Sequence, residues 1–377
     1  MQLYQASHQW ATRPDDQKFH TIEDALKTSR EYAESAVERA DINPAALRCE
    51  AEGKDVVLLH KGGIPAKLTH WAFGQLAGVA AAPAGYLRRL PPTLASQNLN
   101  YGLAERFGNT ANPKVSDASM NLLLHSNGSL VARAITSERY SRIWNYELLE
   151  KMRDLHTYGW ENPVPFEFVN GTQRSGEKPA PTIYVSDHDM FVFQVNNQNR
   201  IAEPGNPSGL GRGFFVENSE VGAARFRLTT FLYRYICGNH MVWGAENVNE
   251  IAVRHVGSAH DRMLYQLDRL AVELKAYENS SASMDEARVK AARSFQIKAA
   301  DKDALLDKIF SMLKGQVTRT TLQKSYDLAT EHELTDGDPY SAWGFAQGMT
   351  RFSQTIPYTD ERVKVDRAAG RVLAMAF

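Results

Sequence analysis

The sequence predicts an α+β fold in which a central antiparallel sheet with hairpin-helix units is flanked by helical N- and C-terminal parts. Two observations support this prediction. In the middle of the chain, runs of β-branched and aromatic residues are separated by Asn-Gly and Asn-Ser turns. Toward both ends, apolar residues recur at helical spacing behind Ser and Thr caps. We expect an N-terminal, mainly helical part with a small hairpin over residues 1–106, a central α+β domain over 107–257 and a C-terminal helical region over 258–377.

Composition limits the classes of function. The chain has 377 residues, of which 43% are hydrophobic and 23% charged, as in ordinary folded proteins. Its formal net charge of −1 provides no global attraction to nucleic acid or to a membrane, so any basic site must be local. The two cysteines, Cys49 and Cys237, form no CxxC pattern, and no apolar run is long enough to span a bilayer. We therefore expect a cytoplasmic protein that does not bind membranes.

The N-terminal part is predicted to hold short helices around one hairpin. Thr21 can cap a first helix, whose apolar face would consist of Ile22, Ala25, Leu26, Ala33 and Val37. Residues 47–52 and 55–60 alternate as two strands around a Gly53-Lys54 turn. Thr69 can cap a helix that runs to about Ala81, and further helical pieces extend to about Arg106.

The central part is predicted to begin with a hairpin over residues 120–125 and 129–136, because Asn127-Gly128 favours a tight turn. A helix over about 146–157 follows. This hairpin-then-helix order resembles that of single-strand annealing proteins of the Rad and Redβ kind. Two more strands are expected over 179–185 and 190–195, and the Asn-, Gly- and Pro-rich stretch 196–213 is expected to be a surface loop.

The stretch from Gly213 to Trp243 combines more aromatic, glycine and charged residues than any other part of the chain. A short strand over 214–216 should end at the turn formers Asn218 and Ser219. Beyond that turn, an alternating strand would place Arg225 and Arg227 on one face, opposite the apolar pair Phe226 and Leu228. Residues from 231 onward fit either a strand or a helix. The C-terminal region then reads as helices over about 258–278, 283–295, 302–313 and 322–333, with a mostly helical tail from 340.

Two segments of this stretch carry a family resemblance. Val216-Glu217-Asn218-Ser219-Glu220-Val221-Gly222 and Arg234-Tyr235-Ile236-Cys237-Gly238-Asn239 resemble the signature of phage- and plasmid-borne proteins catalogued as a domain of unknown function. Residues 187–193, residues 76–100 and Ser341-Ala342-Trp343-Gly344 fit the same family. His240 is a departure, because the family more often has glycine there. The resemblance implies a mobile genetic element and indicates no chemistry.

Three groups of residues are candidates for catalysis or metal binding. Asp187, His188 and Asp189 offer two carboxylates and an imidazole to a divalent ion, or else form a turn held by side-chain hydrogen bonds. Glu217 and Glu220 suit paired catalytic carboxylates, or ion pairs with neighbouring arginines. Cys237 and His240 could form a nucleophile pair, although an apolar run before Cys237 favours a buried, inert thiol.

Basic residues interleaved with aromatic ones form two patches. Arginine for phosphates and aromatic rings for bases is the combination that single-stranded nucleic acid requires. The alternative is that the rings belong to the core and the arginines are solvated. The residues predicted to bind nucleic acid are Arg133, Arg139, Tyr140, Arg142 and Trp144 in one patch, with Lys151 nearby, and Arg225, Arg227 and Arg234 in the other, with Tyr233, Tyr235 and Trp243 nearby.

These patches favour a nucleic-acid-binding protein of a phage or plasmid that binds or anneals single-stranded DNA. Such a protein would need no cofactor and would act as a homo-oligomer. The first alternative is a metal-dependent enzyme acting on nucleic acid at Asp187, His188 and Asp189. The second is a mobile-element protein that blocks a host defence factor.

Overall fold

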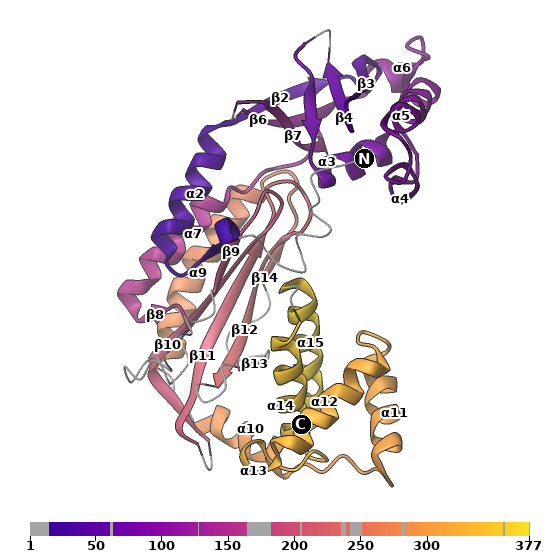
Figure 1. Ribbon diagram of the computed structural model, residues 1–377. Helices are drawn as coiled ribbons and strands as arrows, with labels where there is room; N and C mark the ends of the chain where they lie inside the picture. Colours follow the sequence, from indigo (N-terminus) through magenta and orange to yellow (C-terminus); the bar gives the residue numbers. More distant parts are fainter. Residues whose placement is uncertain are drawn as a thin grey trace.

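The computed structural model describes residues 15–60, 63–126, 128–163, 182–203, 206–234, 239–241, 251–279, 283–356 and 359–376. It has the α+β architecture that the sequence predicts. Figure 1 shows an arc with a sheet-and-helix unit at the N-terminal end, a long-stranded sheet in the middle and a helical unit at the C-terminal end.

The N-terminal unit is built on a six-stranded sheet rather than on one hairpin. The predicted hairpin is present as β3 (Leu47–Glu52) and β4 (Asp55–His60). Two unpredicted strands, β2 (Ala36–Ile42) and β5 (Ala66–Leu68), extend it. The hairpin predicted for the central part, β6 (Met120–Ser126) and β7 (Leu130–Ser137), completes it in the order β2-β6-β7-β5-β4-β3. The sheet therefore joins residues from both sides of the expected boundary at residue 106.

Helices cover one face of this sheet. They are α3 (His70–Val79), α4 (Ala84–Leu87), α5 (Pro92–Phe107) and α6 (Pro113–Ser116). As predicted, Thr69 caps α3, since its side chain accepts a hydrogen bond from the Ala72 amide at 3.1 Å. The apolar faces of α3 and α5 pack on the strands around Phe73, Leu99 and Leu122, and this core is separate from that of the central sheet.

The first helix, α2 (Ile22–Glu34), begins behind Thr21 as predicted but ends earlier. Ser35 caps its C-terminus, so Val37 lies in β2 and not on the helix's apolar face, and 44% of its surface is exposed. The prediction for Val37 was wrong because pairing of β2 with β6 overrides the helical spacing.

The central sheet follows the order β1-β9-β10-β11-β12-β13, with antiparallel pairing throughout. Its members are β1 (Lys18–Phe19), β9 (Ile183–Val185), β10 (Met190–Glu203), β11 (Asn206–Asn218), β12 (Phe226–Arg234) and β13 (Asn239–Met241), with β8 (Trp160–Glu161) paired to β10 and β14 (Ile251–Val253) paired to β12. The segment from 231, which fits a strand or a helix by sequence, continues β12 as a strand up to Arg234, and residues 235–236 lie outside the described residues.

The expectation of a surface loop over residues 196–213 was wrong. β10 and β11 extend through this stretch on both sides of residues 204–205, with register shifts near Ile201. Gly209 takes a φ of +65°, which suits an irregular pairing. Ile201 and Leu210 are fully buried against the C-terminal helices. This tertiary burial explains why a Gly- and Asn-rich stretch forms strands.

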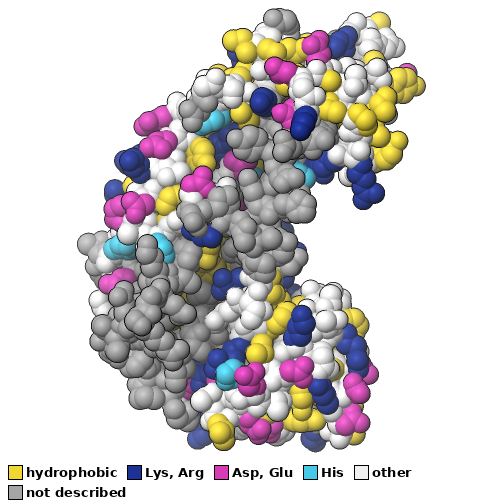
Figure 2. All heavy atoms as spheres, in the orientation of Figure 1, with side chains coloured by type: hydrophobic (Ala, Val, Ile, Leu, Met, Phe, Trp, Pro, Cys, Tyr) yellow, Lys and Arg dark blue, Asp and Glu magenta, His cyan; other side chains and the backbone are white. Residues whose placement is uncertain are grey.

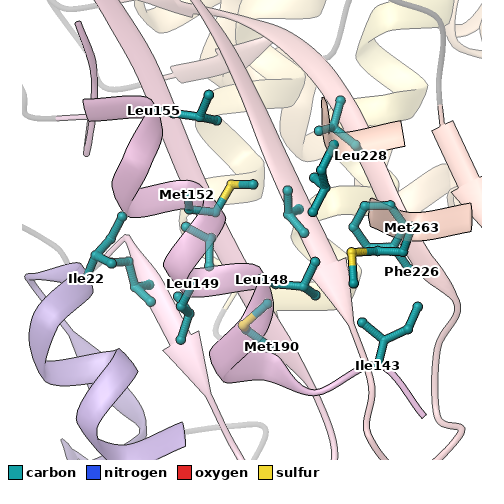
Figure 3. Close-up of a cluster of buried hydrophobic side chains, with 14 of the residues drawn as sticks. Ile22, Ile143, Leu148, Leu149, Met152, Leu155, Met190, Phe226, Leu228 and Met263 are labelled. Atoms are coloured by element: carbon teal, nitrogen blue, oxygen red, sulfur yellow. The ribbon is translucent and has the colours of Figure 1, made fainter. Parts of the chain in front are cut away.

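One face of the central sheet packs on three helices, α2, α7 (Asn145–Asp154) and α9 (Ala259–Asn279). Figure 3 shows Phe226 and Leu228 in this core with Leu148, Met152 and Met263. The predicted inward orientation of Phe226 and Leu228 is therefore confirmed, and each has no exposed surface. Burying a side chain of this size stabilises the fold by about 1.5–3 kcal/mol.

The opposite face carries an aromatic cluster made of Tyr184, Phe191, Phe193, Val195, Phe215, Phe231 and Tyr233. Phe193 stacks on Phe215 with ring centroids 5.2 Å apart. Helix α15 (Thr359–Leu373) reaches this face, where the guanidinium of Arg367 lies 5.6 Å from the centroid of the Phe215 ring. Both faces of the strands are thus packed.

The C-terminal unit consists of α10 (Ser283–Ser294), α11 (Lys302–Leu313), α12 (Arg319–Glu331), α13 (Glu333–Asp336), α14 (Ala342–Gln354) and α15. Helix α14 lies at its centre, and its residues from Ala342 to Thr350 are all buried. Gly348 allows α12 to approach, since a Cβ there would lie 2.1 Å from the Ser325 carbonyl oxygen. On the face shown in Figure 2, acidic and basic side chains are interspersed over this unit. Among the described helices, none combines the length and hydropathy that crossing a membrane requires.

Candidate nucleic-acid interface

The loop between β11 and β12, residues 219–225, joins the N-terminal unit to the central sheet. The Val221 carbonyl oxygen accepts hydrogen bonds from Trp71 Nε1 at 3.0 Å and Gln75 Nε2 at 2.8 Å, both on α3. The Tyr140 hydroxyl donates to the Ser219 carbonyl oxygen at 3.0 Å. Gly222 has a φ of +83°, a conformation that favours glycine. We call residues 219–225 the signature loop.

Glu220 in the signature loop forms a buried ion pair with Arg133 of β7. Arg133 Nη2 lies 2.9 Å from Glu220 Oε2, and the two side chains are 3% and 1% exposed. The other Glu220 oxygen accepts from the Asn145 amide at 2.9 Å. Arg133 also donates to the Asp187 carbonyl oxygen at 2.8 Å. This predicted arginine therefore holds the junction together and is not exposed to a nucleic acid.

Glu217 pairs with Arg227, directly across the β11–β12 ladder, at 3.0 Å. Arg367 of α15 lies 3.7 Å from the second Glu217 oxygen. Glu217 thus lies next to two arginines. Of the two alternatives for this residue, a catalytic carboxylate or an ion pair, the structure has the ion pair. Arg225 differs from Arg227, because it lies one residue before β12 and is exposed.

Arg234, at the far end of β12, is 1% exposed and bonds to two buried carboxylates. Its Nε donates to Glu203 at 2.8 Å, and its Nη1 to Asp336 of α13. Arg293 and Arg351 reach the same two carboxylates. Burial alone would raise the pKa of Asp336, but the hydrogen bond from Arg351 and the charge of Arg234 hold it below its usual value. In this arrangement the Arg234 guanidinium clamps the C-terminal helices to the sheet and is not open to a phosphate.

Arg142, Tyr140 and Trp144 pack on one another. The Arg142 guanidinium lies 5.4 Å from the Tyr140 ring centroid and 5.3 Å from that of Trp144, and it pairs with Glu38. The Tyr140 ring also stacks on His255 at 5.3 Å with an angle of 8° between the planes. Tyr140 and Trp144 are only partly exposed. Their rings therefore support the surface from beneath and do not form an open stacking platform.

The turn from Ser186 to Asp189 connects β9 and β10 and is held by its own side chains. Ser186 Oγ donates to Asp189 Oδ1 at 2.7 Å, and His188 Nδ1 lies 2.8 Å from Asp187 Oδ1. Burial opposes ionisation of Asp187, but His188 and Arg133 keep the pKa of its carboxyl below the usual value. Within the described ranges, no three His, Cys, Asp or Glu side chains are arranged to hold a metal ion. The hydrogen-bonded turn is the arrangement that the structure has.

The remaining predicted residues are less informative. Lys151 on α7 lies 3.5 Å from Asp268 at the surface. Cys237, Tyr235 and Trp243 lie outside the described residues. His240 is in β13, where its backbone pairs with Tyr233.

The structure brings together four arginines, two of which, Arg139 and Arg225, are predicted from the sequence to bind nucleic acid. Arg139, Arg225, Arg254 and Arg262 are all exposed and form no ion pair with a carboxylate among the described residues. We call these four the arginine rim. Arg262 Nη2 donates to the Val256 carbonyl oxygen at 2.7 Å, which fixes its side chain along this segment. Glu138 and Asp261 are exposed acids of the same segments, so positive charge is in excess there.

Backbone pairing brings the segments of the arginine rim side by side. Phe226 pairs with Val253 in the β12–β14 ladder, and Tyr140 pairs with Val256 in an isolated bridge. Continuing the β12–β14 register by one residue places Arg225 opposite Arg254. The sequence signal for Arg254 was present but weak: this arginine directly follows the short apolar run Ile251-Ala252-Val253.

His255, beneath the arginine rim, should make stability pH-dependent. Burial lowers the pKa of its imidazole to about 4, against a usual value near 6.5. A group with a lowered folded-state pKa binds protons more tightly when unfolded, so stability is lost as pH falls from about 6.5 toward 4. We expect His255→Phe, which keeps the stacking on Tyr140, to flatten this loss by on the order of 1–2 kcal/mol at pH 5. Urea titrations of both proteins at pH 7 and pH 5 measure it, and parallel losses would contradict it.

The fold and the junction define an α+β protein organised around a loop that connects two sheets. Residues 133–356 match the family described as "Domain of unknown function (DUF932)", and this range is more than half of the 377 residues. The chain belongs to this family. The matched range starts at Arg133 and contains the signature loop, the central sheet from β8 onward and most of the C-terminal helices. No curated protein and no solved structure matches the chain.

Proposed function

We propose that this protein binds single-stranded nucleic acid by its sugar–phosphate backbone at the arginine rim, as a binding or annealing factor of a phage or plasmid. The observation that carries the proposal is the set of exposed arginines without a carboxylate partner among the described residues, gathered on three adjacent segments. Guanidinium groups at a surface bind phosphates well because each offers several donors in a fixed plane. With a net charge of −1, such a local cluster is what a nucleic-acid site requires.

Two further features support this proposal. The β6–β7 hairpin is followed by α7, which is the order that resembles annealing proteins. Beneath the arginine rim, Tyr140, His255 and Arg142 form a packed layer that would hold the rim segments in a fixed position. We further propose that the protein acts as a homo-oligomer, because annealing requires several subunits along one strand. Light scattering with and without an oligonucleotide tests this.

The direct test is the double variant Arg225→Ala with Arg254→Ala. We expect weaker binding of a labelled single-stranded oligonucleotide, and a log–log salt dependence that is shallower by about one to two units, because two phosphate contacts are lost. Fluorescence anisotropy over a series of salt concentrations measures both quantities. The fold should be unaffected, since exposed charges contribute little to stability.

The matched control is Arg48→Ala with Arg319→Ala, which removes the same charge from two exposed positions outside the arginine rim. Normal binding and an unchanged salt slope in the Arg225 and Arg254 variant would contradict the proposal. Adding magnesium to the same samples tests the alternative of a metal-dependent enzyme, which predicts cleavage of the strand. A wild-type protein that binds no strand even at low salt would leave the alternative of a defence-blocking protein.

A further inference from the structure

A pocket of about 450 Å³ opens on the N-terminal unit next to the signature loop. One wall comes from the ends of α3 and α5, and the other from β6, β7 and the residues before β6. We propose that this pocket takes one unpaired base of a strand whose phosphates lie at the arginine rim. The inference rests on the proposed function, which it deepens by naming the feature of the strand that is read.

The walls of the pocket suit the flat, apolar face of a base with a polar edge. Val79, Phe107, Met120 and Ile135 are the main apolar groups. Two serines, Ser119 and Ser137, also line the pocket and add polar character to its walls. Proteins that hold an unstacked base combine apolar packing on its face with hydrogen bonds to its edge. The volume lies within the range of pockets that bind small ligands.

The mouth of the pocket has a fixed cation. Arg106 Nη1 donates to the carbonyl oxygens of Gly78 at 3.2 Å and Val79 at 2.6 Å. Its guanidinium lies 5.4 Å from the Phe107 ring centroid. The other nitrogens of this group have no partner among the described residues. Arg106 is therefore held in place with donors left over for a phosphate beside the base.

The pocket lies close to Arg139, one member of the arginine rim. Ser137 lines the pocket, and Arg139 follows two residues later, so their Cα atoms are at most about 7 Å apart. Gln75 also lines the pocket, and it bonds both to the Val221 carbonyl oxygen of the signature loop and to the Ile135 amide at 2.9 Å. A strand at the arginine rim would thus pass close enough to place one base in the pocket.

Gly78 allows the pocket to be filled with little strain. It lines the pocket within α3, has an ordinary helical backbone, and a Cβ added there meets nothing within 4 Å. Gly78→Leu should therefore fold well, because leucine favours a helix more than glycine does. Gly85→Leu is the matched control, since Gly85 has the same open space on α4 but does not line the pocket. Ser119→Leu fills the pocket from the opposite wall.

The experiment compares a thymidine oligonucleotide with an abasic strand of equal length, which has the same phosphates. We expect the wild-type protein to bind the abasic strand about tenfold more weakly, the effect of one lost base contact. Gly78→Leu and Ser119→Leu should bind the thymidine strand as weakly as the abasic one and leave abasic binding unchanged. Gly85→Leu should match the wild type on both strands.

The outcomes separate the two proposals. Equal affinity of the wild type for both strands, or unchanged thymidine binding by both filled variants, overturns the base pocket while the arginine rim stands. If the Arg225→Ala, Arg254→Ala variant loses affinity equally for both strands, the rim contacts phosphates as proposed. Failure of the wild type to bind either strand overturns both proposals. Melting curves for each variant confirm that folded protein is being compared.

Discussion

Replacing Arg234 with alanine is expected to lower the free energy of unfolding by about 3–5 kcal/mol, the cost of breaking a buried ion pair by removing one partner. Arg234 is the cation that Glu203 and Asp336 share, and neither carboxylate side chain has any exposure. Arg293 and Arg351 would still reach these carboxylates, but both are more exposed than Arg234. The effect should therefore fall toward the lower end of the range. Urea unfolding at pH 7, followed by circular dichroism, gives the value.

The control for this prediction is Arg319→Ala. Arg319 also pairs with two carboxylates, Asp303 and Asp307, but all three side chains are about half or more exposed. Exposed pairs contribute about 0–1 kcal/mol, so this variant should be nearly as stable as the wild type. An Arg234→Ala protein of wild-type stability would show that the clamp between β12 and α13 is not needed for folding. If that variant instead lost nucleic-acid binding at full stability, the prediction that Arg234 binds nucleic acid would be supported.

Replacing Glu220 with alanine should cost about 3–5 kcal/mol as well, because Arg133 would remain as a buried cation. The loss also leaves the Asn145 amide without its acceptor. Because Glu220 lies in the loop that Trp71 and Gln75 also hold, the variant should loosen the N-terminal unit from the central sheet. Limited proteolysis and urea unfolding should both detect this change.

A double-mutant cycle isolates the ion pair. Arg133→Met fills much of the same volume without charge, so adding it to Glu220→Ala should restore part of the lost stability. The surface pair Arg30 and Glu150 is the comparison, with both side chains at least a third exposed, and its cycle should give a coupling below about 1 kcal/mol. Independent, additive losses at Arg133 and Glu220 would contradict a buried pair.

Local patterns in the sequence predicted most of the fold. Thr21 and Thr69 cap helices because a side-chain oxygen and an amide three residues later are sufficient for that contact. Phe226 and Leu228 face the core because strand side chains alternate regardless of what packs on them. The turn at Ser186–Asp189, one of the two alternatives for Asp187, His188 and Asp189, also depends only on side chains within four residues of one another.

Longer-range features were less accessible. The spacing of Val37 from the other apolar residues fits a helix. Val37 lies in a strand because β2 pairs with β6. Residues 196–213 have the composition of a loop, and they form strands because Ile201 and Leu210 are buried by helices distant in sequence. Propensity describes the residue alone, whereas the partner that buries it depends on the path of the chain.

The same distinction between local pattern and long-range packing applies to the candidate site. By itself, the sequence determined that arginines and aromatic residues gather around the β11–β12 turn, and that basic residues there are in excess. The tertiary structure alone decided which of them remain available. Arg133 meets Glu220 across 87 positions and Arg234 meets Asp336 across 102, whereas Arg139 and Arg225 stay exposed beside Arg254. Residue type sets the charge of an arginine, but its availability depends on whether folding brings a carboxylate within reach.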